Sequence, residues 1–320
     1  MLVTLLFIAT CFVAFTNGAN ANFKGVASLY GSGTTSLRVA LWWGTATTFA
    51  GALAALFLAQ GLLRAFSGKG LVPDALVQSP SFVLAVALGA ALTSFLATRF
   101  GFPVSTTHAL TGALVGAGLA SGDHTVHPGA LGKTFVQPLL LSPVLAIGLG
   151  ALLHFVLKSV QLLPDHRTRT LDTLHFLSGG AASFARGLND TPKMAALLLV
   201  AHAFDIRWGM LAVAVMTAIG GLLDARRVAE TLAKKVTDMN PGEGFAANVA
   251  TAALVITASI YSLPVSTTHV SVGSLLGIGI VTRQAKWPSV GQIMLSWLIT
   301  LPCAAALAAL AALAFRGSQG

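Results

Sequence analysis

Long apolar stretches, each about as long as a bilayer is thick, are the feature of this sequence that most restricts its fold. They lie near residues 2–17, 39–63, 80–98, 134–157, 194–223, 245–262 and 290–315. A membrane-spanning helix needs roughly 20 such residues. Charged residues make up only 9% of the chain, against roughly 25% in a soluble domain. The sequence therefore predicts an all-α, multi-pass protein of the cell membrane, with the lipid bilayer as its surroundings.

The net charge of +9 does not indicate a nucleic-acid partner. The basic residues gather in short loops, at 158–169 and 226–235, as the topology of membrane proteins requires. No basic run is interleaved with aromatic residues in the manner typical of nucleic-acid binding. We expect no nucleic-acid binding, and we expect the loop at 226–235 to face the cytoplasm.

The hexapeptide Pro-Val-Ser-Thr-Thr-His occurs twice, at 103–108 and again at 264–269. Three glycines after the first copy recur after the second: Gly112, Gly116 and Gly118 match Gly273, Gly277 and Gly279, all 161 positions further on. Apolar composition does not by itself produce such a match, so the chain contains an internal duplication. In membrane proteins a duplication of this kind is typical of transporters, whose site lies between the halves near the bilayer midplane.

A second, weaker pair of motifs precedes the hexapeptides in the same order. Phe15, Gly18, Asn20 and Lys24 match Phe184, Gly187, Asn189 and Lys193, each 169 positions further on. Because this pair places the N-terminus inside the repeat, we expect residues 1–21 to be kept, although their Ala-Asn-Ala end resembles a signal-peptide cleavage site. The expected organisation is a first transmembrane repeat at 1–157, a polar linker at 158–172 and a second transmembrane repeat at 173–316.

Each hexapeptide has the composition of a backbone break followed by a helix start. Ser and Thr are favoured N-caps, and a helix N-terminus presents free N–H groups and a positive dipole end, which bind anions. Two such ends, one from each half, would enclose a tetrahedral oxyanion. A bond from each hydroxyl back to the preceding helical turn is the alternative. The candidate anion contacts are Ser105, Thr106, Thr107, Ser266, Thr267 and Thr268.

The segments around the hexapeptides, 102–119 and 263–280, are interrupted by their own Pro and Gly residues. We expect each of them to form a re-entrant helical hairpin rather than a complete span. The earlier motif of each half should lie in a broken helix, because an unwound backbone with Asn and Asp side chains supplies oxygen ligands for a hard cation. Asn20, Asn189 and Asp190 are the candidate ligands, for Na⁺ if the coupling ion is sodium.

The charged residues of these motifs have two interpretations each. An ionisable residue at membrane depth indicates a functional site, whereas the structural alternative for Asp190 is an ion pair with Arg186 or Lys193. Lys24, Lys193 and Arg186 are candidates for attracting an anion to the site. The lysines could equally reach from a helix end to the membrane surface.

No motif of an enzyme is present. The chain lacks a Gly-x-Ser-x-Gly elbow, a His-Glu-x-x-His zinc motif and a nucleotide-binding P-loop. We therefore expect no enzymatic activity and no cofactor, and we expect transport to be coupled to a gradient of Na⁺ or H⁺. An anion channel is the competing class, because two broken hairpins could also line a pore.

The paired motifs resemble those of the inorganic phosphate transporter family, which includes bacterial sulfate permeases. The resemblance rests on the hexapeptides and on the segments Gly18–Gly25 (GANANFKG) and Gly187–Lys193 (GLNDTPK). It implies two inverted repeats and secondary active transport by alternating access, of phosphate first and of sulfate as the alternative. It implies that the Ser-Thr-Thr hairpins enclose the anion, that Asn20, Asn189 and Asp190 serve the cation and help to orient the substrate, and that the protein is a homodimer.

The sequence departs from the pattern of that family at Ala21, where the first motif has an acidic residue. With Asp190 as the only midplane carboxylate, the expected site has one negative charge fewer. A dianion would then need less compensation by cations. The departure leaves open an altered stoichiometry, coupling to protons, or a different oxyanion such as sulfate.

Overall fold

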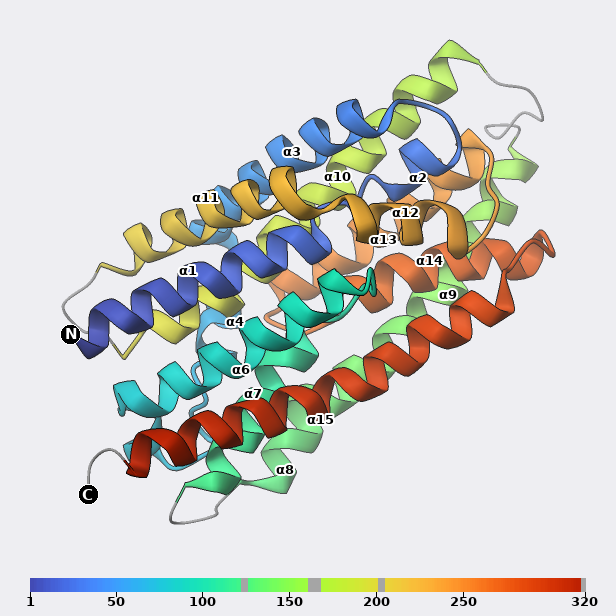
Figure 1. Cartoon of the computed structure of the whole chain (residues 1–320). Helices are drawn as coiled ribbons and strands as arrows, with labels where there is room; N and C mark the ends of the chain where they lie inside the picture. The colour runs from blue at the N-terminus through green and yellow to red at the C-terminus, as the bar shows by residue number, and fades with distance from the viewer. Residues whose placement is uncertain (122–125, 161–167, 201–204, 318–320) are drawn as a thin grey trace.

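The structure is a computed structural model that describes residues 1–121, 126–160, 168–200 and 205–317. The described residues form helices and no strand. In the first half these are α1 (Leu2–Ala21), α2 (Ala27–Gly31), α3 (Leu37–Leu58), α4 (Gln60–Ala65), α5 (Asp74–Val77), α6 (Pro80–Arg99), α7 (Thr106–Ala120), α8 (Pro128–Ala130), the π-helix η1 (Leu131–Val136) and α9 (Gln137–Ser159). In the second half they are α10 (Arg169–Ala195), the 3-10 turn η2 (Ala196–Leu198), α11 (Ile206–Asp224), α12 (Arg226–Lys235), α13 (Pro241–Ile260), α14 (Thr267–Val281) and α15 (Trp287–Gly317). Figure 1 shows them in one bundle of long helices.

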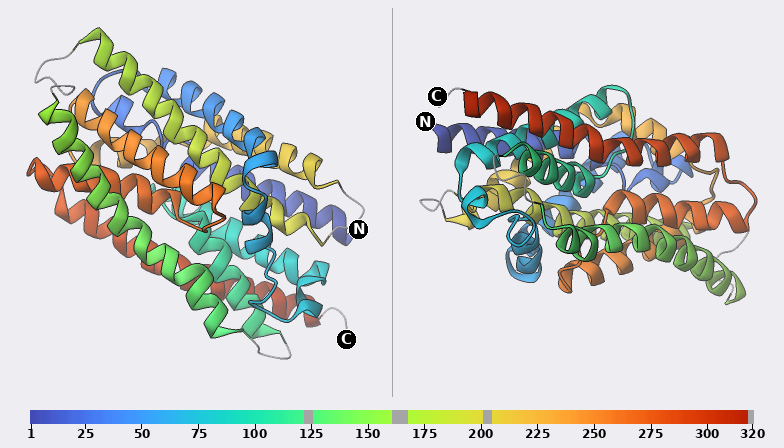
Figure 2. Two further views of the ribbon diagram at one scale, coloured as in Figure 1. Left: turned by 180° about the vertical axis from the view of Figure 1, so that it is seen from behind. Right: turned by 90° about the horizontal axis from the view of Figure 1, so that it is seen from below.

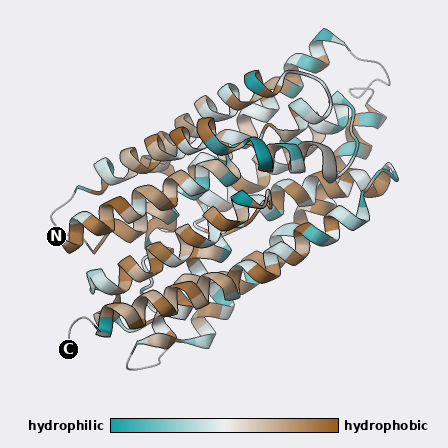
Figure 3. Cartoon of the chain, viewed as in Figure 1, coloured by the Kyte–Doolittle hydropathy of each residue, from teal (hydrophilic) through white to brown (hydrophobic). Residues whose placement is uncertain are grey.

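Seven stretches within the described residues are helical, long enough and apolar enough to cross a membrane. They are Leu2–Ala21, Leu37–Leu58, Pro80–Arg99, Pro128–Ser159, Ile206–Asp224, Pro241–Ile260 and Trp287–Arg316. Apolar residues cover these helices along their length (Figure 3), and large ones such as Phe57 and Leu298 are exposed. A surface of this kind suits lipid, so the prediction of a multi-pass, all-helical membrane protein is confirmed. The beginning of α1 and the end of α15 lie at the same end of the bundle (Figure 2).

One predicted apolar stretch is divided differently in the structure. Residues 194–223 do not form one helix: their first part completes α10 and η2, and the span itself is α11. The helix that the apolar pattern missed is α10, which has 27 residues and is therefore about 40 Å long. It is too polar to be recognised as a span from its composition. Its buried part, from Ser178 onward, packs between α3 and α13, so protein rather than lipid surrounds its polar residues.

The two hairpins have the same helix boundaries in both halves. One consists of α6 and α7 and the other of α13 and α14, and each helix of the second starts and ends 161 residues after its counterpart. The sequence prediction placed a complete hairpin within 102–119 and another within 263–280, and in this respect it was wrong. Each of those segments is one helix with an extended lead-in, and the other arm is the full-length helix before it. The backbone turns between the arms at Gly101 and Ser262, where φ is positive.

Glycines do not break the second arm of either hairpin, because they serve its packing. A Cβ atom on Gly116 would lie 2.0 Å from the carbonyl oxygen of Ala305 in α15, and one on Gly277 would lie 2.2 Å from that of Ile147 in α9. The glycines therefore let α7 and α14 lie against α15 and α9 with almost no separation.

The second arms start side by side and run in opposite directions. The Thr107 hydroxyl of α7 donates to the Val265 carbonyl at 3.0 Å, and the Thr268 hydroxyl of α14 donates to the Val104 carbonyl at 2.8 Å. From this shared point α7 runs to the end of the bundle where α15 ends, and α14 runs to the end where α15 begins (Figure 1). Opposed directions of equivalent helices are what an inverted repeat requires.

Candidate anion site between the two halves

Two buried lysines connect the hairpins to each other. The Lys24 ammonium donates to the Val104 carbonyl at 2.7 Å and to the Thr268 hydroxyl. The Lys193 ammonium donates to the Val265 carbonyl at 2.7 Å and to the Thr107 hydroxyl at 2.8 Å. Each lysine thus holds a carbonyl of its own half and a hydroxyl of the other. Their exposed fractions are 3% and 0%, so neither side chain reaches the membrane surface. The alternative in which the lysines extend to that surface is therefore wrong.

The six hydroxyl residues of the hexapeptides lie together, and they have three different sets of partners. Ser105 and Ser266 are N-caps, whose oxygens accept the N–H of His108 and His269 at 3.2 Å. The hydroxyls of Thr107 and Thr268 have no free proton, because each donates to a carbonyl and also accepts from a lysine. None of these hydroxyls bonds back to the preceding turn of its own helix.

Thr106 and Thr267 differ, although they are equivalent in the repeat. Thr267 donates to the Asp190 carboxylate at 3.2 Å, so its proton is in use. Thr106 instead accepts from the side-chain amide of Asn17, which leaves its proton free. Free donors are therefore the hydroxyls of Ser105, Ser266 and Thr106. The N–H groups of the first two residues of α7 and α14, Thr106, Thr107, Thr267 and Thr268, also have no described acceptor.

Asp190 lies between two cations, as the ion-pair alternative for this residue predicted. Its carboxylate is 3.3 Å from the Lys193 ammonium and 3.7 Å from the Arg186 guanidinium, and all three side chains are at most 3% exposed. Lys24, Arg186 and Lys193 carry three formal positive charges and Asp190 one negative charge, so the described cluster has an excess of two positive charges. A buried charge without compensation is costly. The cluster is therefore suited to an anion.

The backbone around the Asn motifs is helical, and the prediction of an unwound backbone there was wrong. Asn189 and Asp190 lie inside α10, which continues past Pro192 to Ala195. Asn20 lies in the last turn of α1, which ends at Ala21. The break in each half therefore follows the motif and does not interrupt it.

The two asparagines hold the hairpins in place. The Asn20 carbonyl oxygen accepts the Val104 N–H at 3.0 Å, and its amide donates to Thr98 and to the Phe102 carbonyl. The Asn189 amide donates to Ser259 at 2.8 Å, and its oxygen accepts from Lys193. The oxygens expected to bind a cation thus already have protein donors. Among the described residues, no group of three or more His, Cys, Asp or Glu side chains could hold a metal ion.

Arg186 has partners that the sequence motifs did not include. Its guanidinium donates to the side-chain oxygens of Asn17 and Asn22 and to the Thr48 hydroxyl. Asn17 is the counterpart of Arg186 in the 169-residue repeat, and Ala21 is the counterpart of Asp190. Where the second half has an ion pair one helical turn apart, the first half therefore has two neutral residues. The repeat spacing could have revealed this exchange.

Trp297 of α15 also supports the site, and no pattern in the sequence marked it. Its indole N–H donates to the Pro103 carbonyl in the lead-in to α7 at 3.2 Å, and its ring lies 4.0 Å from that of His269 in α14. One side chain therefore contacts both hairpins.

The chain is similar to known proteins along nearly its whole length. Residues 17–308 match the model of the phosphate transporter family. The chain is 29% identical to a probable low-affinity inorganic phosphate transporter of Rhizobium meliloti, over 97% of this chain and 95% of that protein. It is 28% identical to a sulfate permease of Bacillus subtilis, over 87% and 77%. A solved structure described as a sodium-dependent phosphate transporter shares the fold, with a TM-score of 0.85, 21% identity and coverage of 98% and 99%.

Proposed function

The chain belongs to the phosphate transporter family, and we propose that it carries a tetrahedral oxyanion, phosphate first and sulfate as the alternative, across the cell membrane. Proteins similar to it are described as transporters of phosphate and, in one case, as a permease for sulfate. Transporters move their substrate without changing it chemically. The chain is accordingly assigned no enzymatic activity.

The observation that carries the proposal is the positive excess of two charges between the hairpins. Lys24 has no carboxylate within ion-pair distance among the described residues, whereas Lys193 has Asp190. We assign Lys24 and Lys193 to the attraction of a dianion. The free hydroxyls of Ser105, Ser266 and Thr106 and the N–H groups at the starts of α7 and α14 would then donate to its oxygens.

Thr107, Thr268 and Thr267 use their hydroxyls in hydrogen bonds within the protein. Thr107 and Thr268 join the hairpins, and Thr267 orients Asp190. In this proposal they shape the site, and they contact the anion only through their backbone N–H groups. Arg186 contributes its positive charge to the site without contacting the anion. Its guanidinium lies 3.7 Å from the Asp190 carboxylate, with which it forms an ion pair.

We place the coupling cation, Na⁺ or H⁺, in the second half of the site, at Asp190 and Asn189. Asp190 is the only carboxylate among the described residues of the cluster, and Lys193 would have to move for a metal ion to reach it. Asn20 positions the first hairpin and is not assigned to the cation. Alternating access would expose this single site to the two sides in turn, since both halves contribute to it.

Uptake into proteoliposomes tests the proposal. Labelled phosphate should accumulate against its gradient when Na⁺ or H⁺ is supplied outside, and sulfate should compete for the site. Lys24→Gln should reduce uptake about tenfold or more, because a charge-assisted contact to the anion is lost, while Lys286→Gln at the surface should not. Absence of uptake of both anions would contradict the proposal, and strictly downhill flux would indicate a channel.

A further inference from the structure

A basic vestibule opens to the surface at one end of the site. It has a volume of about 470 Å³ and is lined in part by Arg64, Lys69 and Gln78, all of them exposed. These residues belong to α4 and to the segment between α4 and α6. The described lining includes two cations and no carboxylate. Such a surface raises the local concentration of anions.

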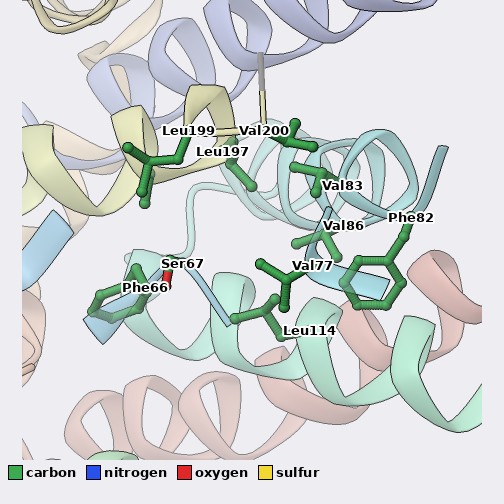
Figure 4. Close-up of a pocket in the computed structure, with 11 residues that line it drawn as sticks. Phe66, Ser67, Val77, Phe82, Val83, Val86, Leu114, Leu197, Leu199 and Val200 are labelled. Atoms are coloured by element: carbon green, nitrogen blue, oxygen red, sulfur yellow. The ribbon is translucent and has the colours of Figure 1, made fainter. Parts of the chain in front are cut away.

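An apolar neck continues from the vestibule into the protein. It is a cavity of about 20 Å³ that shares Ser67, Val77, Leu199 and Val200 with the vestibule. Figure 4 shows its wall, which is formed by aliphatic and aromatic side chains except for the Ser67 hydroxyl. A volume of this size holds about one water molecule. The neck is therefore closed to a phosphate or sulfate ion.

Phe66 forms the inner end of this neck. Its ring lies 5.6 Å from the Lys193 ammonium, in the site, and packs edge-on against Phe135 with the centroids 5.2 Å apart. Phe66 itself lines the neck and is 3% exposed. One buried side chain thus lies beside both the apolar neck and the ammonium group that we assign to the anion.

The α7 helix joins the neck to the site along one face. Leu114 lines the neck and Thr107 contacts Lys193. Thr111 lies between them on the same stripe of the helix, because residues spaced by three and four share a face. Its buried hydroxyl has no partner among the described residues. The inner side of the barrier therefore offers a free polar group.

The opposite end of the site is packed tightly. There α2 lies against α12, and a Cβ atom on Gly31 would be 2.5 Å from the Ala233 carbonyl oxygen. Phe23, Leu29, Val228 and Leu232 fill the space between the helices and are at most 1% exposed. Figure 1 shows α2 and α12 toward the upper right of the bundle and α4 toward the lower left.

We propose that Phe66 is the gate through which the oxyanion enters from the vestibule formed by Arg64 and Lys69. This inference rests on the proposed function for the identity of the ion, but the path and its barrier can be tested without transport. Rotation of the Phe66 ring away from Lys193 would join the neck to the site, and the anion would reach the ammonium when the side chains of the neck also move apart. The ring in its present position separates the ammonium from the vestibule.

Cysteine accessibility tests the barrier directly in the full-length protein. Both native cysteines are replaced in the variant Cys11→Ala/Cys303→Ala, and a reporter is introduced as Gln78→Cys in the vestibule or as Thr111→Cys beyond Phe66. A charged, water-soluble thiol reagent should label the outer reporter faster than the inner one. Adding Phe66→Ala should speed labelling of the inner reporter about tenfold or more, because truncation of a buried ring opens a cavity.

Phe82→Ala is the matched control, since Phe82 lines the same neck and no contact between Phe82 and Lys193 is described. It should leave the labelling rate of the inner reporter within about twofold of the parent. Equal labelling rates with and without Phe66→Ala, or equal acceleration by both truncations, would overturn the assignment of Phe66 as the gate.

Transport separates this inference from the proposed function. If the parent protein takes up no phosphate or sulfate, the proposed function fails, and the labelling result still decides whether Phe66 is a barrier. If uptake is present, Arg64→Gln/Lys69→Gln should raise KM several-fold at low salt and much less at high salt. The control Arg207→Gln alters an exposed arginine that does not line the vestibule and should leave KM unchanged. An unchanged KM in the double variant would overturn the role of the vestibule.

Discussion

Ala21 and Asn17 are residues at which the two halves differ in charge. Their counterparts, Asp190 and Arg186, form an ion pair across one turn of α10. The exchange removes a cation and an anion together, so it leaves the net charge of the first half unchanged. What it does change is the environment of Lys24, which has hydroxyl and carbonyl partners where Lys193 also has a carboxylate.

The variant Ala21→Asp should place a carboxylate three residues before Lys24, as Asp190 stands before Lys193. The positive excess would fall from two charges to one, and the affinity for a dianion should fall about tenfold, or about 1.4 kcal/mol. Equilibrium binding of sulfate, measured with and without Na⁺, checks this, and added Na⁺ should restore part of the lost affinity. Ala21→Asn, of the same size without the charge, is the control; an equal loss in both variants would contradict the electrostatic explanation.

Removal of both cap serines should weaken transport without preventing folding. In Ser105→Ala/Ser266→Ala, each helix loses a cap that contributes about 1 kcal/mol, and the site loses two free hydroxyl donors. Uptake should fall about tenfold or more, while the amount of protein in the membrane stays similar. The control is Ser36→Ala, which removes the cap of α3 far from the hairpins. Unaltered uptake in the double variant would remove these serines from the site.

At the scale of elements, close contact between helices places the hairpins. Gly116 lies so near α15 that a methyl group would meet the Ala305 carbonyl oxygen at 2.0 Å, whereas Gly148 of α9 has nothing within 4 Å. The same substitution at the two positions therefore has opposite expected effects.

Gly116→Ala should destabilise the protein by about 1–3 kcal/mol, because α7 and α15 must separate. Gly148→Ala should be neutral or stabilising by up to about 1 kcal/mol, because alanine favours the helix. Thermal unfolding in detergent, followed by circular dichroism, measures both. A melting temperature for Gly116→Ala equal to that of the parent would show that the helices can adjust to the methyl group.

At the scale of the whole molecule, the two ends of the site differ in how they are closed. The α2–α12 end is closed by direct helix contact, and the α4 end by the apolar neck and Phe66. Alternating access requires the α2–α12 contact to open when the neck closes further. A Cβ atom on Gly31 would lie 2.5 Å from the Ala233 carbonyl oxygen and 3.5 Å from the Ala233 Cα atom. A cysteine at position 31 must therefore displace α2 slightly, and cysteines at 31 and 233 would then lie within reach of a disulfide.

A disulfide there should lock transport. In a background of Cys11→Ala/Cys303→Ala, oxidation of Gly31→Cys/Ala233→Cys should abolish uptake, and reduction should restore it, since the bond holds α2 against α12. Binding of phosphate in detergent should persist in the oxidised protein, because the neck end remains free to open. Each single cysteine variant serves as the control. Full uptake by the cross-linked protein would contradict alternating access at this end.

Most of the architecture follows from local patterns in the sequence. Apolar runs of spanning length predicted six of the seven spanning helices of the described residues closely, because lipid accepts only segments that satisfy their own backbone bonds. The duplicated motifs predicted that Ser105 and Ser266 start equivalent helices and that Lys24 and Lys193 are equivalent in the repeat, and they left the role of the two lysines open. These are properties of short segments, and a repeat makes them visible.

The membrane location, the two related halves and the hydroxyl motifs that start equivalent helices could thus be predicted from the sequence. Tertiary structure decided that α10 crosses the bundle despite its polar residues, because neighbouring helices rather than lipid surround it. It decided that Asn20 and Asn189 hold the hairpins, that Arg186 reaches Asn17, and that Phe66 stands beside Lys193. Those contacts join residues up to about 170 positions apart, and no local spacing encodes which distant side chains the packing of helices brings together.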